Sequence, residues 1–180
     1  MHAQLVAIES ELTVASARLE ALARNLNDQQ WVRRPAESRS SPVECVQHLN
    51  LTAAATLPRI REGLDEARRL GGGLPTTFHR DLVGWFLWRG LRQPGRFKSK
   101  TAAAFVPDAH RPVSEVLGQF RRWQAEQIAC VRECDGLPVH RVRMTSPFSA
   151  RIRYSVYSAL TILVVHTHRH LWQAEQASTD

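Results

Sequence analysis

Two histidines near the end of the chain have a spacing at which both imidazoles can bind one metal ion. His166 and His170 lie four residues apart in a segment of helical periodicity, so their side chains are about 6 Å apart on one helix face. His168 is two residues from each, about 200° around the helix, and is expected to be exposed or at an interface. Eight histidines in 180 residues produce such pairs by chance, so a site needs support from the rest of the fold.

The second long helix has an unusually complete set of start and stop signals. Ser41 is a candidate N-cap, Pro42 occupies the first helical position, and Glu44 completes a capping box. The helix is expected to continue toward residue 69 with a kink at Pro58, and three glycines at 71–73 end it.

Three further helices follow from apolar residues at steps of three and four, over residues 3–25, 113–134 and 152–177. No repeat or domain boundary is evident, so residues 1–180 are interpreted as a single domain. The predicted fold class is all-α, a four-helix bundle. The connection over residues 71–111 is far longer than the roughly 2 to 8 residues that join antiparallel neighbours. It predicts a crossover between helices two and three, which then run parallel.

This topology predicts that a third histidine lies near the pair. His48 lies about 9 Å into the second helix, and His170 lies about 10 Å from the end of the fourth. If helices two and four are antiparallel, these depths coincide, and His48, His166 and His170 form one site. Three neutral imidazoles leave a further coordination position open on a divalent ion, an arrangement typical of catalytic zinc. Water or a thiol bound there has a lowered pKa. Imidazole suits zinc and nickel equally.

Short motifs spread over nearly the whole chain form a recognisable set: Trp31, Pro35, Ser41-Pro-Val-Glu-Cys-Val-Gln-His48-Leu49, Phe105-Val-Pro-Asp, Ser146-Pro-Phe and His166-Thr-His-Arg-His170-Leu-Trp-Gln173. Together they resemble the DinB-like (DinB/YfiT) family of metal-binding four-helix bundles. The resemblance assigns the family's three metal ligands to His48, His166 and His170, and it implies the same long second connection.

The resemblance also implies a function. Several family members are transferases or isomerases that use a low-molecular-weight thiol, so a metal-dependent thiol S-transferase with a small-molecule substrate is expected. The alternative is a non-catalytic metal-binding or stress-response bundle. The catalytic residues and the substrate are not identified, and the chain departs from the family in its aromatic and basic insert, Leu82 to Lys100.

Other candidate residues lie beside the predicted site. Gln173, one turn beyond His170, is a candidate for orienting a ligand or a bound water. Cys45, one turn before His48, is weighed as a fourth ligand, but a small buried residue is the favoured interpretation. Cys130 and Cys134 are placed too far along the bundle to share a site with His166. His79, His110 and His140 lie in loops without an assigned partner.

The insert carries three aromatic residues that are candidates for a lid over the open coordination position, for a homodimer contact, or for ordinary burial against the bundle (Trp85, Phe86 and Trp88). Arginines such as Arg89 and Arg92 suit acidic groups on a thiol cosubstrate. The basic stretch from Arg89 to Lys100 is interpreted mainly as a solvated loop.

Composition limits the remaining function classes. The chain is 43% hydrophobic and 23% charged, which is typical of a folded domain, and its net charge is +7. The basic residues are scattered arginines, with only two lysines (Lys98 and Lys100) and no recognised motif, so nucleic-acid binding is not expected. The chain has only three cysteines and no recognisable signal peptide, so a cytoplasmic protein is expected. It also has no apolar stretch of about 20 residues, so no membrane span is expected.

Overall fold

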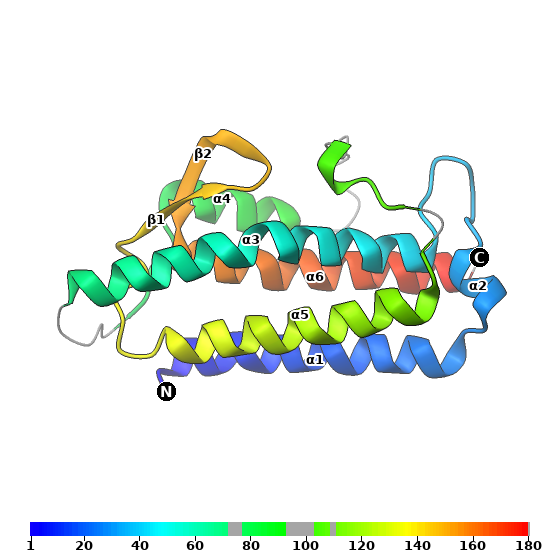
Figure 1. The fold of residues 1–180 in the computed structure, drawn as a ribbon, viewed down its shortest axis with the longest axis horizontal. Coiled ribbons are helices and arrows are strands. Elements are labelled where there is room, and N and C mark those ends of the chain that lie inside the picture. The colour runs from blue at the N-terminus through cyan, green and yellow to red at the C-terminus, as the bar shows by residue number, and fades with distance from the viewer. Residues whose placement is uncertain (72–76, 93–102, 109–110, 180) are drawn as a thin grey trace.

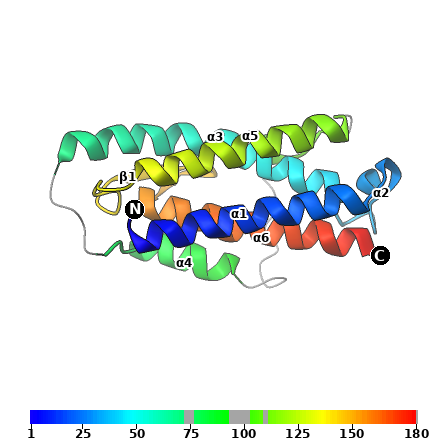
Figure 2. The ribbon, with the colours of Figure 1, turned by 90° about the horizontal axis from the view of Figure 1, so that it is seen from below.

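The computed structural model describes residues 1–71, 77–92, 103–108 and 111–179. Four long helices lie along its longest axis (Figure 1): α1 (Ala3–Asn25), α3 (Pro42–Leu70), α5 (Val113–Glu133) and α6 (Val156–Thr179). Helices α1 and α6 run in one direction, and α3 and α5 run in the other (Figures 1 and 2). The predicted bundle and the parallel course of α3 and α5 are confirmed.

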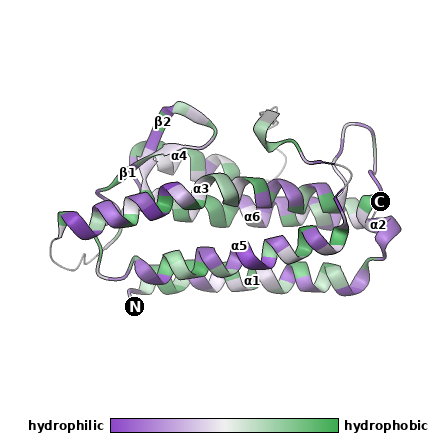
Figure 3. Ribbon diagram, in the orientation of Figure 1, coloured by the Kyte–Doolittle hydropathy of each residue, from purple (hydrophilic) through white to green (hydrophobic). Residues whose placement is uncertain are grey.

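Local signals account for the helix bounds. Ser41 and Glu44 form the predicted capping box at the start of α3, and α3 continues through Pro58 to a left-handed Gly71 with φ of 59°. Along α1 the buried residues recur at steps of three and four, and Figure 3 shows apolar and polar residues alternating around the long helices. Among the described residues, no helix has the length and apolar character that a membrane crossing requires.

Two short helices and a 3₁₀ turn accompany the bundle. Helix α2 (Asp28–Val32) follows α1, helix α4 (Leu82–Leu91) packs on α6, and the turn η1 (Ala103–Phe105) lies on α3. The long connection between α3 and α5 therefore contains structure of its own, and residues 93–102 of it lie outside the described part.

A β-hairpin corrects the predicted start of the last helix. Strands β1 (Arg143–Ser146) and β2 (Ser149–Ser155) pair antiparallel, with Met144 opposite Tyr154. The helix begins at Val156 rather than at Ile152, because β2 alternates exposed arginines with residues that face the bundle. The Ser155 hydroxyl then accepts a hydrogen bond from Ser158 N and caps α6.

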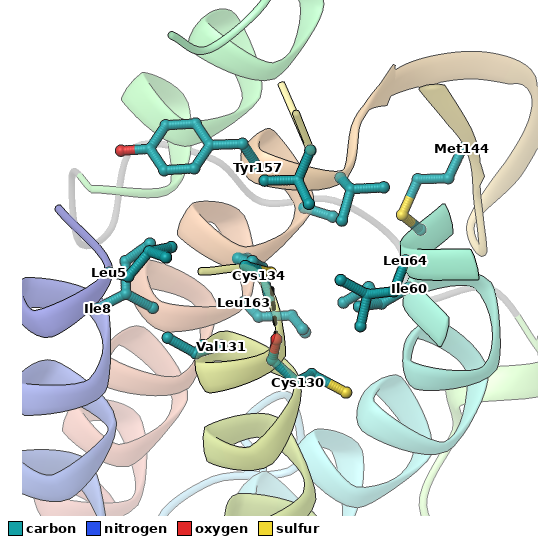
Figure 4. Packing of buried hydrophobic residues seen from close by; sticks show 14 of the residues in the cluster. Leu5, Ile8, Ile60, Leu64, Cys130, Val131, Cys134, Met144, Tyr157 and Leu163 are labelled. Carbon is teal, nitrogen blue, oxygen red and sulfur yellow. Dashed lines mark hydrogen bonds between the residues drawn. The ribbon is translucent and has the colours of Figure 1, made fainter. Parts of the chain in front are cut away.

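The core consists of two apolar clusters along the bundle axis. One surrounds Ile60, Leu64 and Val131 near the hairpin (Figure 4), and the other surrounds Trp31, which is 2% exposed, near α2. Between the helices, buried amide side chains bond to backbone carbonyls of their neighbours, as Asn50 Nδ2 does to Val116 O at 2.9 Å. These contacts hold α3 in register with its neighbours and so fix the depth of His48.

Candidate metal centre

The structure brings His48 of α3 together with His166 and His170 of α6. The ring centroid of His48 lies 5.2 Å from that of His166 and 4.5 Å from that of His170. The ring centroids of the two α6 histidines are 4.5 Å apart. One nitrogen of each ring lies within 4.8 Å of the others, so the cluster can hold a metal ion. Metal–nitrogen bonds of about 2.0 to 2.1 Å require nitrogens about 3.4 Å apart, so the three side chains would draw closer around a bound ion.

Burial keeps the three imidazoles neutral, which is the form that binds a metal. His48 and His166 are each only 8% exposed. Burial, reinforced by the neighbouring His48 and Arg169, lowers the pKa of His166 to about 3. Burial also lowers the pKa of His170 well below its usual value, while a hydrogen bond with the Gln173 side chain acts in the opposite direction. Their lone pairs are therefore free at neutral pH.

The ring of His48 is oriented by a backbone carbonyl. Its Nδ1 lies 3.0 Å from the carbonyl oxygen of Phe105 in η1, an acceptor that assigns the proton to Nδ1. Nε2 then carries the lone pair. Burial lowers the pKa of His48, and this hydrogen bond opposes the shift. Metal-bound histidines commonly have such a hydrogen bond on the nitrogen that does not bind the metal.

His166 has an unsatisfied nitrogen. Its Nδ1 is buried and has no hydrogen-bond partner among the residues that the structure describes. A buried polar atom without a partner carries a desolvation cost of about 1 to 3 kcal/mol, which a ligand can remove. The donor set of three neutral imidazoles, one of them unsatisfied, therefore fits a divalent ion of the zinc or nickel type.

Two aromatic side chains border the cluster, and the spacing of the histidines did not reveal them. Phe105 is buried, and its ring lies 6.4 Å from that of His48. Phe148, in the turn of the hairpin, packs against Phe105 with the ring centroids 4.4 Å apart and the rings tilted by 35°, and its ring lies 6.3 Å from that of His166. Both belong to short motifs that support the family resemblance, which was the available signal. They give the site an apolar wall.

Several other candidate residues lie elsewhere. Cys45 is buried in the apolar cluster around Trp31, and burial raises the pKa of its thiol to about 12, so it is not part of the histidine group. Cys130 and Cys134 belong to the other apolar cluster. His168 lies on the opposite side of α6, where its Nε2 is 2.9 Å from Glu11 Oε2.

The loop residues and the insert are also accounted for. His140 lies 5.8 Å from the ring of Phe78, His79 is exposed, and His110 is outside the described residues. Trp88 stacks with two arginines in a groove on the far side of α6 from the metal-site histidines, and the first part of the insert forms α4. The aromatic residues next to the histidines are instead Phe105 and Phe148.

The chain was compared with known protein families, curated proteins and solved structures. The chain has no match among the curated proteins or the solved structures with which it was compared. The model of the DinB superfamily matches residues 11–174, a range that includes all three histidines and both aromatic residues of the site wall. The chain therefore belongs to the DinB superfamily.

Proposed function

We propose that the protein binds one divalent metal ion through His48, His166 and His170 and uses it in a transferase reaction of a small thiol. The observation that carries the proposal is the convergence of three neutral imidazoles from antiparallel helices, two of them buried and one half-buried, with nitrogens within 4.8 Å, in a member of the DinB superfamily. Three protein ligands leave room for an exogenous ligand, as in catalytic rather than structural zinc sites.

The residues of the chain have separate roles in this proposal. The Phe105 carbonyl holds the His48 ring through Nδ1, which leaves Nε2 as the nitrogen that would bind a metal, and Gln173 hydrogen-bonds His170. Phe105 and Phe148 limit access of water from one side. A bound divalent ion lowers the pKa of a coordinated thiol or water, so that the thiolate or hydroxide is present at neutral pH.

The proposed reaction joins the thiol sulfur to an electrophilic carbon. The sulfur donates the electron pair of the new bond, the leaving group departs with the pair of the bond that breaks, and the thiol proton passes to solvent. Among the described residues, only the three histidines form a cluster that could hold the metal ion.

Elemental analysis of protein purified without an affinity tag tests the metal site. We expect one zinc or nickel ion per chain, and loss of the ion in His170→Ala. His168→Ala is the matched control, because His168 lies on the same helix and faces away from the cluster. Retention of the metal in His170→Ala, or absence of metal from the wild type after addition of zinc and nickel, would contradict the site.

Turnover tests the transferase step separately. Glutathione, bacillithiol and mycothiol are each offered with a panel of electrophiles, with and without added metal. We expect metal-dependent thiol transfer that His170→Ala abolishes while the circular dichroism spectrum stays helical. If no thiol turns over at full metal occupancy, the transferase proposal is wrong and the protein is a non-catalytic metal-binding bundle.

A further inference from the structure

A groove of about 690 Å³ lies between α1, α4 and α6, on the side of α6 that faces away from the metal-site histidines. Thr161, Val165, His168 and Trp172 line it from α6 at successive steps of four, three and four residues, which is one helix face. Since His168 is about 200° around the helix from His166, the groove and the histidine cluster occupy opposite faces of the same helix.

At one end of the groove, the arginine from α1 is paired with a carboxylate. Arg18 of α1 donates to Glu175 through Nε at 2.8 Å and Nη2 at 2.6 Å, and its Nη1 lies 2.9 Å from Nδ1 of His168. The Nε2 of His168 lies 2.9 Å from a carboxylate oxygen of Glu11. The charge of Arg18 is therefore paired with a carboxylate within the protein.

The other end holds two arginines on one indole ring. The guanidinium carbon of Arg80 lies 4.0 Å from the Trp88 ring centroid, and that of Arg92 lies 4.6 Å from it. Arg80 Nε donates to Thr161 Oγ1 at 3.0 Å, seven residues before His168 and so about 10 Å away along the helix. Across the described residues, neither guanidinium group forms a salt bridge with a carboxylate.

This arrangement differs from that of the arginines on the outer surface of the bundle. Arg121 pairs with Glu20, and Arg132 pairs with Glu9, so each of these charges bridges α5 and α1. Arg80, by contrast, is half-buried, and burial together with the charge of Arg92 lowers its pKa. Two like charges beside one ring repel each other, and an anion bound to both offsets this repulsion.

The groove also offers an apolar surface next to these charges. Trp88, Leu91, Val164 and Val165 line it, and Trp172, which is 38% exposed, closes the far side. Guanidinium groups bind carboxylate and phosphate oxygens through paired hydrogen bonds, and indole rings stack on flat apolar bodies. The lining therefore combines an unneutralised cationic end with a wall suited to an aromatic body.

We propose that this groove is a binding site for a small aromatic anion, whose oxyanion head binds Arg80 and Arg92 and whose flat body lies against the apolar lining toward Trp172. The site is separate from the metal centre, and its occupation does not require metal. The head group is a carboxylate or a phosphate, because both match the two guanidinium groups.

Isothermal titration calorimetry with four probes tests each part of this site. The probes are 2-naphthoate, 2-naphthyl phosphate, neutral 2-naphthamide and inorganic phosphate. We expect at least one naphthyl anion to bind about 10-fold or more tightly than both the neutral amide and inorganic phosphate. The tighter of the two naphthyl anions identifies the head group.

Variants locate the binding. Arg80→Gln and Arg92→Gln are each expected to lower the affinity for the naphthyl anion about 10-fold or more. Arg89→Gln is the matched control, since Arg89 stacks on Trp85 of the same helix at 5.6 Å but does not line the groove. The Arg89→Gln variant should bind the naphthyl anion as tightly as the wild type does. Arg92 lies at the exposed end of α4, so Arg92→Gln keeps the test valid if Arg80→Gln fails to fold.

Three results would overturn the proposal. Equal binding of the naphthyl anion and the neutral amide would remove the role of the arginines. Equal binding of the naphthyl anion and inorganic phosphate would remove the role of the aromatic wall. Equal losses in Arg89→Gln and Arg92→Gln would show attraction by net charge alone. None of these results bears on the metal site, which His170→Ala tests separately.

Discussion

The carbonyl oxygen of Phe105 lies 3.0 Å from Nδ1 of His48, across 57 residues of sequence. This contact links the face of α3 that carries His48 to the crossover that precedes α5. A carbonyl cannot be removed by substitution, but its position depends on the burial of the Phe105 side chain, which is 4% exposed. The orientation of the His48 ring is thus set by the packing of Phe105, a residue outside the histidine cluster.

Phe105→Ala is expected to weaken metal binding by about 10 to 100-fold, because the η1 carbonyl is no longer held against His48. It should also lower the free energy of unfolding by about 3 kcal/mol through the cavity left behind. Competition with a chromophoric chelator measures the affinity. Phe78→Ala is the control, since Phe78 is similarly buried, at 2% exposed, but packs in the apolar cluster around Ile60 and Leu64. Equal losses in both variants would contradict the proposed role of the carbonyl.

Gln173→Ala is expected to have a milder effect than loss of a ligand. Gln173 hydrogen-bonds His170, so its removal should reduce metal affinity or turnover by about 10 to 100-fold while His170→Ala abolishes both. Gln176→Ala, one turn further along α6 and exposed, should match the wild type in the same assays. A Gln173→Ala variant indistinguishable from Gln176→Ala would show that Gln173 has no part in the site.

Glu44 makes the stability of the α3 N-terminus dependent on pH. Its carboxylate is buried, which acts to raise its pKa, but hydrogen bonds from Arg34 and Ser41 outweigh burial and lower the pKa below 4.5. The folded state therefore binds a proton less readily than the unfolded state. The resulting stability is complete above about pH 4.5 and is lost as the pH falls through the lowered pKa.

Glu44→Gln is expected to lower the free energy of unfolding by about 1 kcal/mol at pH 7, a modest figure because Arg34 is largely exposed. The difference from the wild type should shrink as the pH falls below 4.5. Urea unfolding between pH 3 and 7 measures this, with Glu37→Gln in the exposed preceding loop as control. A difference that stays constant across this range would contradict the linkage.

Gly84 allows α4 to approach α6 closely. A Cβ atom at this position would lie 2.2 Å from Ser158 Oγ, so Gly84→Ala is expected to destabilise the protein by about 1 to 3 kcal/mol. Gly118→Ala provides the opposite control, because nothing lies within 4 Å of its Cβ and the helix interior gains up to about 1 kcal/mol. Thermal unfolding distinguishes the two. If Gly84→Ala is as stable as Gly118→Ala, α4 is not packed as described.

The three histidines could be brought together from sequence because their geometry depends on helix periodicity and helix direction. The capping box at Ser41 set the depth of His48, and the length of the crossover set the direction of α3 against α6. The depth of His48 depends on a local sequence signal, and the direction of α3 against α6 depends on the topology of the bundle. The same reasoning excluded Cys134 from the site, and the structure places that residue in the apolar core.

The contacts that complete the site and the hairpin were not predictable in this way. Residues 152–155 continue the apolar pattern of α6, and only their pairing with residues 143–146 makes them a strand. The hydrogen bond from His48 to Phe105 depends on how a loop folds across the bundle, which no periodicity encodes. The sequence likewise does not show which arginines pair with a carboxylate, as Arg18 does, and which lie against an aromatic ring, as Arg92 does.

The origin of the ligands on two helices also affects chain entropy. His166 and His170 are one turn apart, so joining them restricts the chain very little, whereas joining either to His48 closes a loop that contains α4, α5 and the hairpin. Closing so long a loop removes conformational freedom mainly from the unfolded chain. An ion coordinated by all three residues therefore acts as a reversible cross-link, and chelation should cost the protein stability even where no reaction is catalysed.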